Sequence, residues 1–350
     1  MESTTDTPNK RRKPPPNFLI GKESNKESLI SCSHLLIRHT MEITKGNDSL
    51  LVYMKEMLHS IFFLAYIHDR SLTPSEILES KEPQETPGKH NTTSKLHDLI
   101  WKKFPEPFEQ YKTNLPTRTP FSILLHMMEI LYHTAEEIKK ELLILLKKLK
   151  FPNPLHRPGS KKEEYYTLES TVICVCFDSG SSSDSTPKKY FGASLSCRKR
   201  NTKRIMIDVS CLKTWDEYVS HAVMSFTPEG VARELPSSIT FPESVECQAY
   251  IRDWKKNVYK ERRPCLNCKK LFNLKDADPN KVDHPYGNCA ETECLSKLLL
   301  NNQYTRKNTR MENHTDLETL KTTTKERLTK DLADVGINMI IENILFYSPM

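Results

Sequence analysis

The chain has 350 residues, of which 37% are hydrophobic and 28% charged, and it carries a formal net charge of +7. This length and hydrophobic content suffice for two domains with a real core, and nine glycines against 22 prolines indicate a helix-rich soluble protein with stiff loops. The sequence shows no apolar signal-peptide region after its first charges, and its longest uncharged apolar run, residues 57–67, is too short to span a membrane. We therefore expect neither secretion nor a membrane span, and the mild basicity is only weak evidence for a nucleic-acid partner.

The first 26 residues are polar and lack the apolar periodicity that packing requires, so they are predicted to form a disordered basic tail. The tail contains the run Lys10-Arg11-Arg12-Lys13, which is followed by three prolines. Such a run is typical of a nuclear-import signal and also of a solvated charged tail. The expected localisation is therefore cytoplasmic or nuclear.

Residues 27–150 are predicted to form a helical domain, because apolar residues recur there at intervals of three and four. Residues 71–96 interrupt this pattern with Ser, Thr, Glu, Pro and Lys, which predict a loop or linker. The strongest helix should begin with Thr119 as N-cap and Pro120 at the first helical position. Helices are predicted over residues 28–41, 50–67, 94–104 and 121–150.

Residues 151–162 contain three prolines and a glycine and are predicted to be a linker to a second domain, which spans residues 163–350. This second domain is expected to contain both strands and helices, so the fold class is predicted to be α+β or α/β with a small mixed sheet. Strands are predicted over 171–177, 190–197 and 204–209, the first two as a hairpin, with a final strand over 337–347. Helices are predicted over 212–224, 245–259, 264–273, 289–300 and 315–335.

The cysteines point to a metal site. Ten cysteines without a secretion signal indicate reduced thiols, and closely spaced reduced cysteines bind metal more often than they form disulfides. Cys174 and Cys176 lie on one face of a predicted strand and are expected in the core rather than at a metal. Four other cysteines fall within thirty residues, namely Cys265, Cys268, Cys289 and Cys294.

Two short segments carry the chemistry of this cluster, Pro264-Cys265-Leu266-Asn267-Cys268 and Asn288-Cys289-Ala290-Glu291. Each is expected to open a helix, with Pro264 at one start and Asn288 as N-cap of the other. A Pro-Cys-x-x-Cys pair together with a Cys-Ala-Glu segment resembles the zinc-dependent cytidine deaminase superfamily. In that family the two motifs occur in the opposite order. The predicted hairpin over 171–197 also resembles the hairpin that leads into the Cys-Ala-Glu helix of the family, although about ninety residues separate the two in this chain.

The resemblance implies a catalytic zinc site on Cys265, Cys268 and Cys289, with the fourth position open to water. It assigns Glu291 the role of general acid and base. The implied activity is hydrolytic deamination of a base in a nucleotide or nucleic acid, which would make the protein a zinc-dependent hydrolase. If the three thiolates share one Zn²⁺, their sulfur atoms should lie about 3.5 to 4 Å apart.

A closed structural zinc site is the alternative interpretation. Either His284 or Cys294 could supply a fourth ligand, and a fully ligated ion would only stabilise the fold. Glu291 could then serve to cap its helix by bonding back to Asn288. On this interpretation the protein is a non-enzymatic intracellular module that binds nucleic acid or protein.

A basic and aromatic stretch precedes the cluster. Cations next to aromatic side chains suit single-stranded nucleic acid, whose phosphates pair with the cations and whose bases stack. The same pattern is found in a solvated helix with its aromatic residues turned to the core. The stretch contains Tyr250, Arg252, Trp254, Lys255, Lys256, Tyr259, Lys260, Arg262, Arg263, Lys269 and Lys270.

Overall fold

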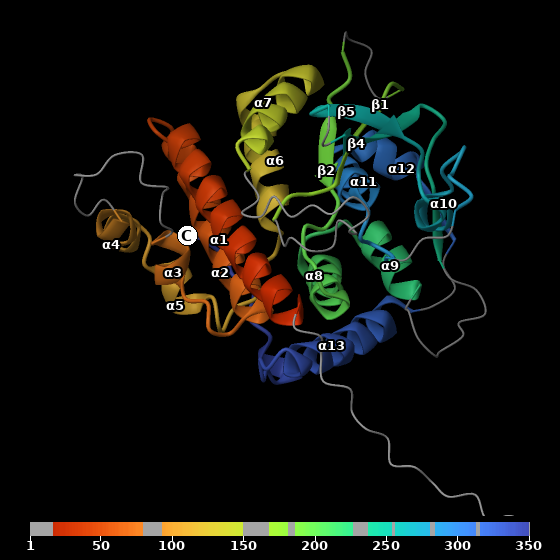
Figure 1. Cartoon of the computed structure of the whole chain (residues 1–350). Coiled ribbons are helices and arrows are strands. Elements are labelled where there is room, and N and C mark those ends of the chain that lie inside the picture. Colours follow the sequence, from red (N-terminus) through yellow and green to blue (C-terminus); the bar gives the residue numbers. More distant parts are fainter. Residues whose placement is uncertain are drawn as a thin grey trace, which may run out of the picture.

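The fold is of the α+β class, with a helical N-terminal region on one side and a small antiparallel sheet with its own helices on the other (Figure 1). It was obtained as a computed structural model, and the structure describes residues 17–79, 93–149, 168–180, 186–226, 237–253, 256–280, 284–312 and 316–349. The predicted tail up to residue 16 and the predicted linker over 151–162 lie outside these described residues.

The N-terminal region packs around one central helix, α2 (Leu51–His68), in which 12 of the 18 residues are buried. By length and composition this helix, with the short 3-10 turn Asp48–Leu50 before it, could cross a membrane, but 72% of the relevant window is buried inside the protein, as in a core helix. The other helices are α1 (Asn17–Ile43), α3 (Pro74–Leu78), α4 (Thr93–Lys103), α5 (Glu106–Gln110), α6 (Pro120–Leu131) and α7 (Ala135–Lys147).

Three boundaries in this region differ from the prediction. Helix α1 already begins at Asn17, whereas residues up to 26 were predicted to be disordered. Helix α3 lies within the predicted loop, where Thr73 caps it. The single helix predicted over 121–150 is two helices, because Thr134 forms a capping box with Glu137 and so starts α7 anew.

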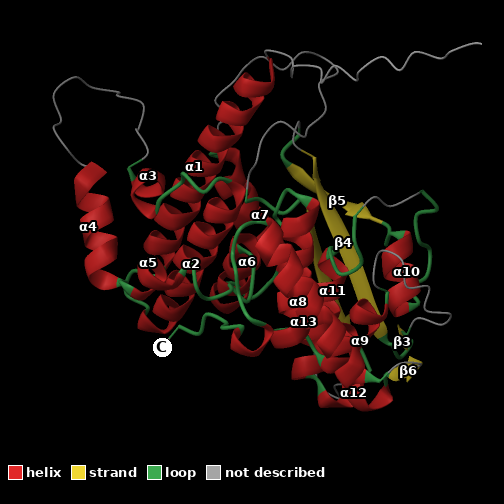
Figure 2. Cartoon of the chain, turned by 90° about the horizontal axis from the view of Figure 1, so that it is seen from below, coloured by secondary structure: helices red, strands yellow, loops and turns green. Residues whose placement is uncertain are grey.

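The main sheet has the strand order β2-β1-β4-β5 and is entirely antiparallel, not mixed as predicted. Figure 2 shows its strands β4 and β5 on the opposite side of the molecule from α3, α4 and α5. The predicted hairpin is confirmed, since Ile173 of β1 lies opposite Ala193 of β2. A second, two-stranded sheet pairs β3 with β6. The strands are β1 (Val172–Asp178), β2 (Tyr190–Ala193), β3 (Ser238–Thr240), β4 (Val245–Asp253), β5 (Val258–Arg262) and β6 (Arg310–Glu312).

Six helices accompany the sheets: α8 (Arg200–Lys213), α9 (Glu217–Ser225), α10 (Leu266–Phe272), α11 (Ala290–Asn301), α12 (Gln303–Asn308) and α13 (Leu317–Asp334). The strand predicted over 204–209 is wrong and lies within α8. Arg204 and Asp208, one helical turn apart, both reach α13, where they form ion pairs with Asp331 and Arg327.

Two further predictions in this half are wrong. The helix predicted over 245–259 is the hairpin of β4 and β5, in which Asn257 adopts a left-handed conformation at the turn. The final strand predicted over 337–347 is a 3-10 turn, Ile341–Asn343, followed by a single bridge from Phe346 to Leu115. Gly336, with a φ of 77°, follows the end of α13.

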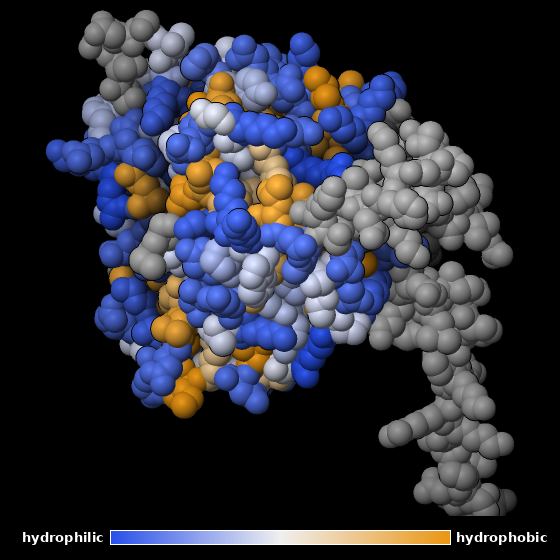
Figure 3. All heavy atoms as spheres, turned by 90° about the vertical axis from the view of Figure 1, so that its left-hand side faces the viewer, coloured by the Kyte–Doolittle hydropathy of each residue, from blue (hydrophilic) through white to orange (hydrophobic). Residues whose placement is uncertain are grey.

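The two halves share one hydrophobic core. Buried Leu124 and Leu145 of the helical region belong to the same cluster as Ile173 and Phe191 of the sheet. At the surface of the helical region, hydrophobic residues are interspersed with hydrophilic ones (Figure 3). The two predicted domains are therefore packed together over a continuous apolar interior.

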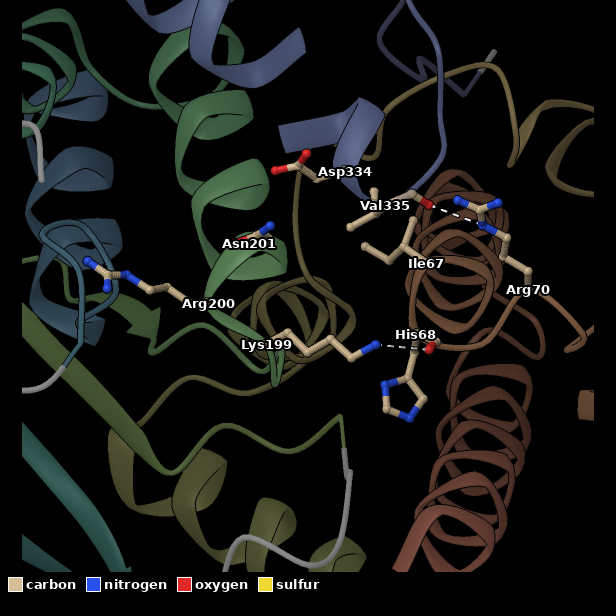
Figure 4. Close-up of a pocket in the computed structure, with 8 residues that line it drawn as sticks. All are labelled: Ile67, His68, Arg70, Lys199, Arg200, Asn201, Asp334 and Val335. Atoms are coloured by element: carbon tan, nitrogen blue, oxygen red, sulfur yellow. Dashed lines mark hydrogen bonds between the residues drawn. The ribbon is translucent and has the colours of Figure 1, made fainter. Parts of the chain in front are cut away.

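Side chains also tie the ends of three helices together where the halves meet (Figure 4). Lys199 Nζ donates to the carbonyl oxygen of His68 at 3.2 Å, and Arg70 Nε donates to that of Val335 at 3.3 Å. A cavity of about 470 Å³ lies between these helix ends. Cations thus satisfy carbonyl groups at the C-terminal ends of α2 and α13, where the helix dipole is negative.

Helix α11 packs directly beneath the hairpin of β1 and β2, and Gly192 permits the close approach. A Cβ atom at Gly192 would lie 2.3 Å from the carbonyl oxygen of Ala290 and 2.4 Å from the amide nitrogen of Cys294. The Glu293 carboxylate accepts a hydrogen bond from the amide of Ala193 at 2.9 Å and another from the Ser122 hydroxyl. The start of α11 is therefore fixed to both halves of the protein.

We predict that Gly192→Ala lowers the free energy of unfolding by about 2–3 kcal/mol, because the new methyl group meets backbone atoms that cannot move independently. The matched control is Gly180→Ala, whose methyl group would have side-chain atoms of Ser244 and Asp178 as its nearest neighbours; its cost should stay below about 1 kcal/mol. Chemical denaturation of both variants measures the difference. Equal stabilities would contradict the assigned role of Gly192.

Candidate metal centre

Two cysteines stand at the starts of neighbouring helices. Cys265 is the N-cap residue of α10 and Cys289 that of α11, and neither side chain caps its helix. The N-cap residue of α11 is therefore Cys289 and not Asn288, as was predicted. Gly287, with a φ of 87°, makes the turn that brings the chain into α11. Both thiols are consequently free to face the space between the two helix starts.

The three predicted thiol ligands lie together. The Sγ atom of Cys265 is 3.6 Å from that of Cys268 and 3.3 Å from that of Cys289. Cys268 and Cys289 also lie within 4.8 Å of each other and of the Glu291 carboxylate. A tetrahedral ion with metal–sulfur bonds of about 2.3 Å separates its sulfur ligands by about 3.8 Å. The sulfur positions therefore fit a common ion.

His284 approaches the same cluster from the loop before α11. Its Nε2 atom is 3.3 Å from the Cys289 Sγ atom, and the ligand atoms of Cys265, His284 and Cys289 all lie within 4.8 Å of one another. These three residues could hold a metal ion. The side-chain amide of Asn267 donates to the carbonyl oxygen of His284 at 2.9 Å and so ties this loop to α10.

Cys294, the other predicted fourth ligand, points away from the cluster. Its Sγ atom lies 3.0 Å from that of Cys176 and 3.1 Å from the carbonyl oxygen of Tyr190, in the interior between α11 and the sheet. Cys174 is nearby and contacts Cys247, with 3.4 Å between the sulfur atoms. Cys174 and Cys176 are completely buried, as expected of core residues.

Burial and mutual contact set the charge of the cluster. Hydrogen bonds from the thiols of Cys268 and Cys289 lower the pKa of Cys265. The hydrogen bonds to Cys265 in turn raise the pKa of Cys268 and of Cys289. Burial raises the pKa of Glu291 to about 7. The cluster therefore favours a thiolate at Cys265, the kind of soft anionic ligand that transition metals bind.

Glu291 does not serve as the capping residue of α11. The helix begins at Ala290, so Glu291 occupies the second position rather than the third, and no capping box with Asn288 forms. Its side chain is only 4% exposed and lies beside the thiols of Cys268 and Cys289. As an acidic residue in the first turn, Glu291 is also favoured there by the helix dipole.

A cavity of about 270 Å³ opens onto the cluster. Its wall includes Cys265, His284, Cys289 and Glu291, and Cys268 lies behind them with no exposed surface. Three cationic side chains also line the cavity, namely Lys203 of α8, Arg262 and Arg263. We call this space the site cavity.

Two of the three cationic residues of the site cavity were identified in the sequence, and the third was missed. Arg262 and Arg263 belong to the predicted basic stretch, but they lie at the end of β5 and not on a helix. Lys203 was missed, since its segment of the sequence gives no signal that α8 faces the cluster. Trp254 and Lys255 of the same basic stretch lie outside the described residues.

Comparison of the chain with protein-family models, with curated proteins and with solved structures gives no match. The evidence for function therefore comes from the site itself.

We predict that Cys289→Ser lowers the metal content of the purified protein by at least about tenfold, because Cys289 contacts both Cys265 and His284 and its loss removes a shared ligand. Cys294→Ser should retain the metal of the wild type, since that thiol faces the sheet. Inductively coupled plasma mass spectrometry measures the metal content of both purified variants. Loss of metal from Cys294→Ser alone would show that the ion is bound elsewhere.

Proposed function

We propose that this protein is a zinc-dependent hydrolytic deaminase acting on a base in a nucleotide or nucleic acid. The observation that carries the proposal is the site cavity, which reaches two thiols of the cluster, Cys265 and Cys289, together with the buried carboxylate of Glu291. A structural metal site has no need of an adjoining cavity with a carboxylate in its wall. A hydrolase needs both.

The donor set favours zinc. Thiols and an imidazole are ligands typical of Zn²⁺ sites, and oxygen-preferring ions such as Mg²⁺ would not select them. Cys265, Cys268 and Cys289 would hold the ion. When bound, zinc would supply a water molecule of lowered pKa for the hydrolysis.

Glu291 would carry the proton. Its carboxylate lies beside two of the thiol ligands and in the cavity wall. It can accept a proton from the water and return it to the amino group that leaves as ammonia. The reaction consumes one water molecule and replaces the exocyclic amino group of the base by an oxygen atom.

The arrangement in space supports the resemblance despite the reversed order of the motifs. The helix that begins with Cys289-Ala290-Glu291 comes about ninety residues after the hairpin of β1 and β2. It nevertheless packs against that hairpin, at Gly192. The elements of the deaminase family would thus be neighbours in the fold while their order along the chain differs.

A closed structural site is the second candidate. It is favoured by one observation, the distance of 3.3 Å between His284 Nε2 and Cys289 Sγ. With His284 as fourth ligand the ion would have no position left for water, and the protein would be a zinc-stabilised module that binds nucleic acid or protein.

We predict that Glu291→Gln retains zinc and lowers kcat at least about 10²-fold, because the amide keeps the shape of the side chain but cannot transfer a proton. Activity is measured as ammonia release from a panel of cytosine- and adenine-containing nucleosides, nucleotides and single-stranded oligonucleotides.

His284→Ala is the companion variant. In an open catalytic site it should retain zinc, and in a closed structural site it should lose zinc. An inactive wild type whose zinc is expelled by His284→Ala would replace the deaminase proposal by the structural one.

A further inference from the structure

The cations of the site cavity outnumber its acids. Among the described residues, Lys203, Arg262 and Arg263 line it, and Glu291 is the one carboxylate. The ends of Arg262 and Arg263 are exposed, and no ion pair joins either guanidinium group to a carboxylate among the described residues. This excess of positive charge at the mouth of a cavity suits an anionic group on the ligand.

A second, larger cavity adjoins the site cavity. It measures about 780 Å³, and Arg262, Arg263 and Pro264 line it. The same two arginines therefore form a wall of both cavities. A molecule that extends from the metal cluster past these arginines would enter the second cavity.

The second cavity is neutral and partly apolar. Glu243, Glu261 and Asp276 balance Arg262, Arg263 and Lys275 in its wall, so it offers no excess charge for a further phosphate. Its remaining wall includes the aromatic rings of Phe241 and Phe272 and the amide side chain of Gln248. Rings and an amide suit the flat face and the polar edge of a nucleobase.

From this juxtaposition we propose that the substrate is a single-stranded polynucleotide. The target base occupies the site cavity, the adjoining phosphodiester pairs with Arg262 and Arg263, and the neighbouring nucleoside enters the second cavity. The inference rests on the proposed function and names the substrate class of the same site. A free nucleotide would fill only the site cavity and leave the second cavity without a role.

The arginines could instead merely offset the negative charge of the thiolates, and the experiment separates these two roles. If they balance the cluster, their removal weakens metal binding. If they bind phosphate, their removal weakens polynucleotide binding while the zinc content stays the same.

The experiment measures binding without turnover. Full-length, zinc-loaded Glu291→Gln protein is titrated into a fluorescein-labelled oligodeoxycytidylate, and the Kd is read from fluorescence anisotropy over a range of salt concentrations. Adding Arg262→Gln and Arg263→Gln should raise the Kd at least about tenfold and reduce the slope of log Kd against log salt by about 0.7, the value for one phosphate contact on a single strand.

The matched control removes two exposed cations that lie outside both cavities, Lys307→Gln with Arg310→Gln, in the same Glu291→Gln background. It should leave the Kd within about twofold, because the net charge changes equally without loss of a phosphate contact. Zinc content and circular dichroism of all three proteins establish that the fold and the cluster are intact.

Competition with cytidine 5′-monophosphate and with inorganic phosphate shows whether the arginines bind the phosphate of a polynucleotide, of a mononucleotide or of the free ion. The proposal expects the oligonucleotide to bind at least about tenfold more tightly than the mononucleotide, because only the oligonucleotide reaches the second cavity. Equal affinity for both, an unchanged Kd in the arginine variant, or loss of zinc from that variant would each overturn it. Tight oligonucleotide binding by a wild type that releases no ammonia would refute the deaminase but not the binding surface.

Discussion

The close contact between Gly192 and the first turn of α11 is the constraint on which the candidate site depends. It sets how deeply the helix lies beneath the hairpin of β1 and β2, and Glu293 then fixes its rotation through Ala193 and Ser122. Cys289 precedes the helix and Glu291 lies within its first turn. The contact with Gly192 therefore also determines where these two residues lie. The ligand cluster is thus placed by backbone packing and not by the flexible loops around it.

The chemistry of the cluster depends on which side chain shares the ion with the three thiols. His284 approaches from a loop, whereas Glu291 approaches from a helix that the sheet holds in place. A ligand on a loop can leave without disturbing the core, but a buried carboxylate on a packed helix cannot. Both residues line the cavity that opens onto the cluster, but only the imidazole stands on a loop outside the packed helix.

Local signals in the sequence were sufficient to predict the cysteine cluster and the hairpin of β1 and β2, but they were insufficient to predict strands β4 and β5. Cysteine spacing and the two helix starts placed Cys265, Cys268 and Cys289 together, because both signals act over a few residues. The segment 245–259 was misassigned because its apolar spacing suits a helix, and only pairing with β1, more than sixty residues away, makes it a strand. Lys203 was missed for the same reason, since its position in the site follows from packing between distant segments.

The core that runs through both halves has a consequence for how this protein can be divided. Ser122 and Glu129 of α6 bind Glu293 and Lys297 of α11, so the helical region supplies part of the packing and hydrogen bonding of the helix that carries the site. A chain cut at residues 151–162 would lose the hydrogen bonds that Ser122 and Glu129 make to α11. Glu293 and Lys297 would then keep only each other and the amide of Ala193 among these partners. The described part of the helical region is therefore better regarded as a scaffold for the half that holds the cysteine cluster than as a detachable accessory domain.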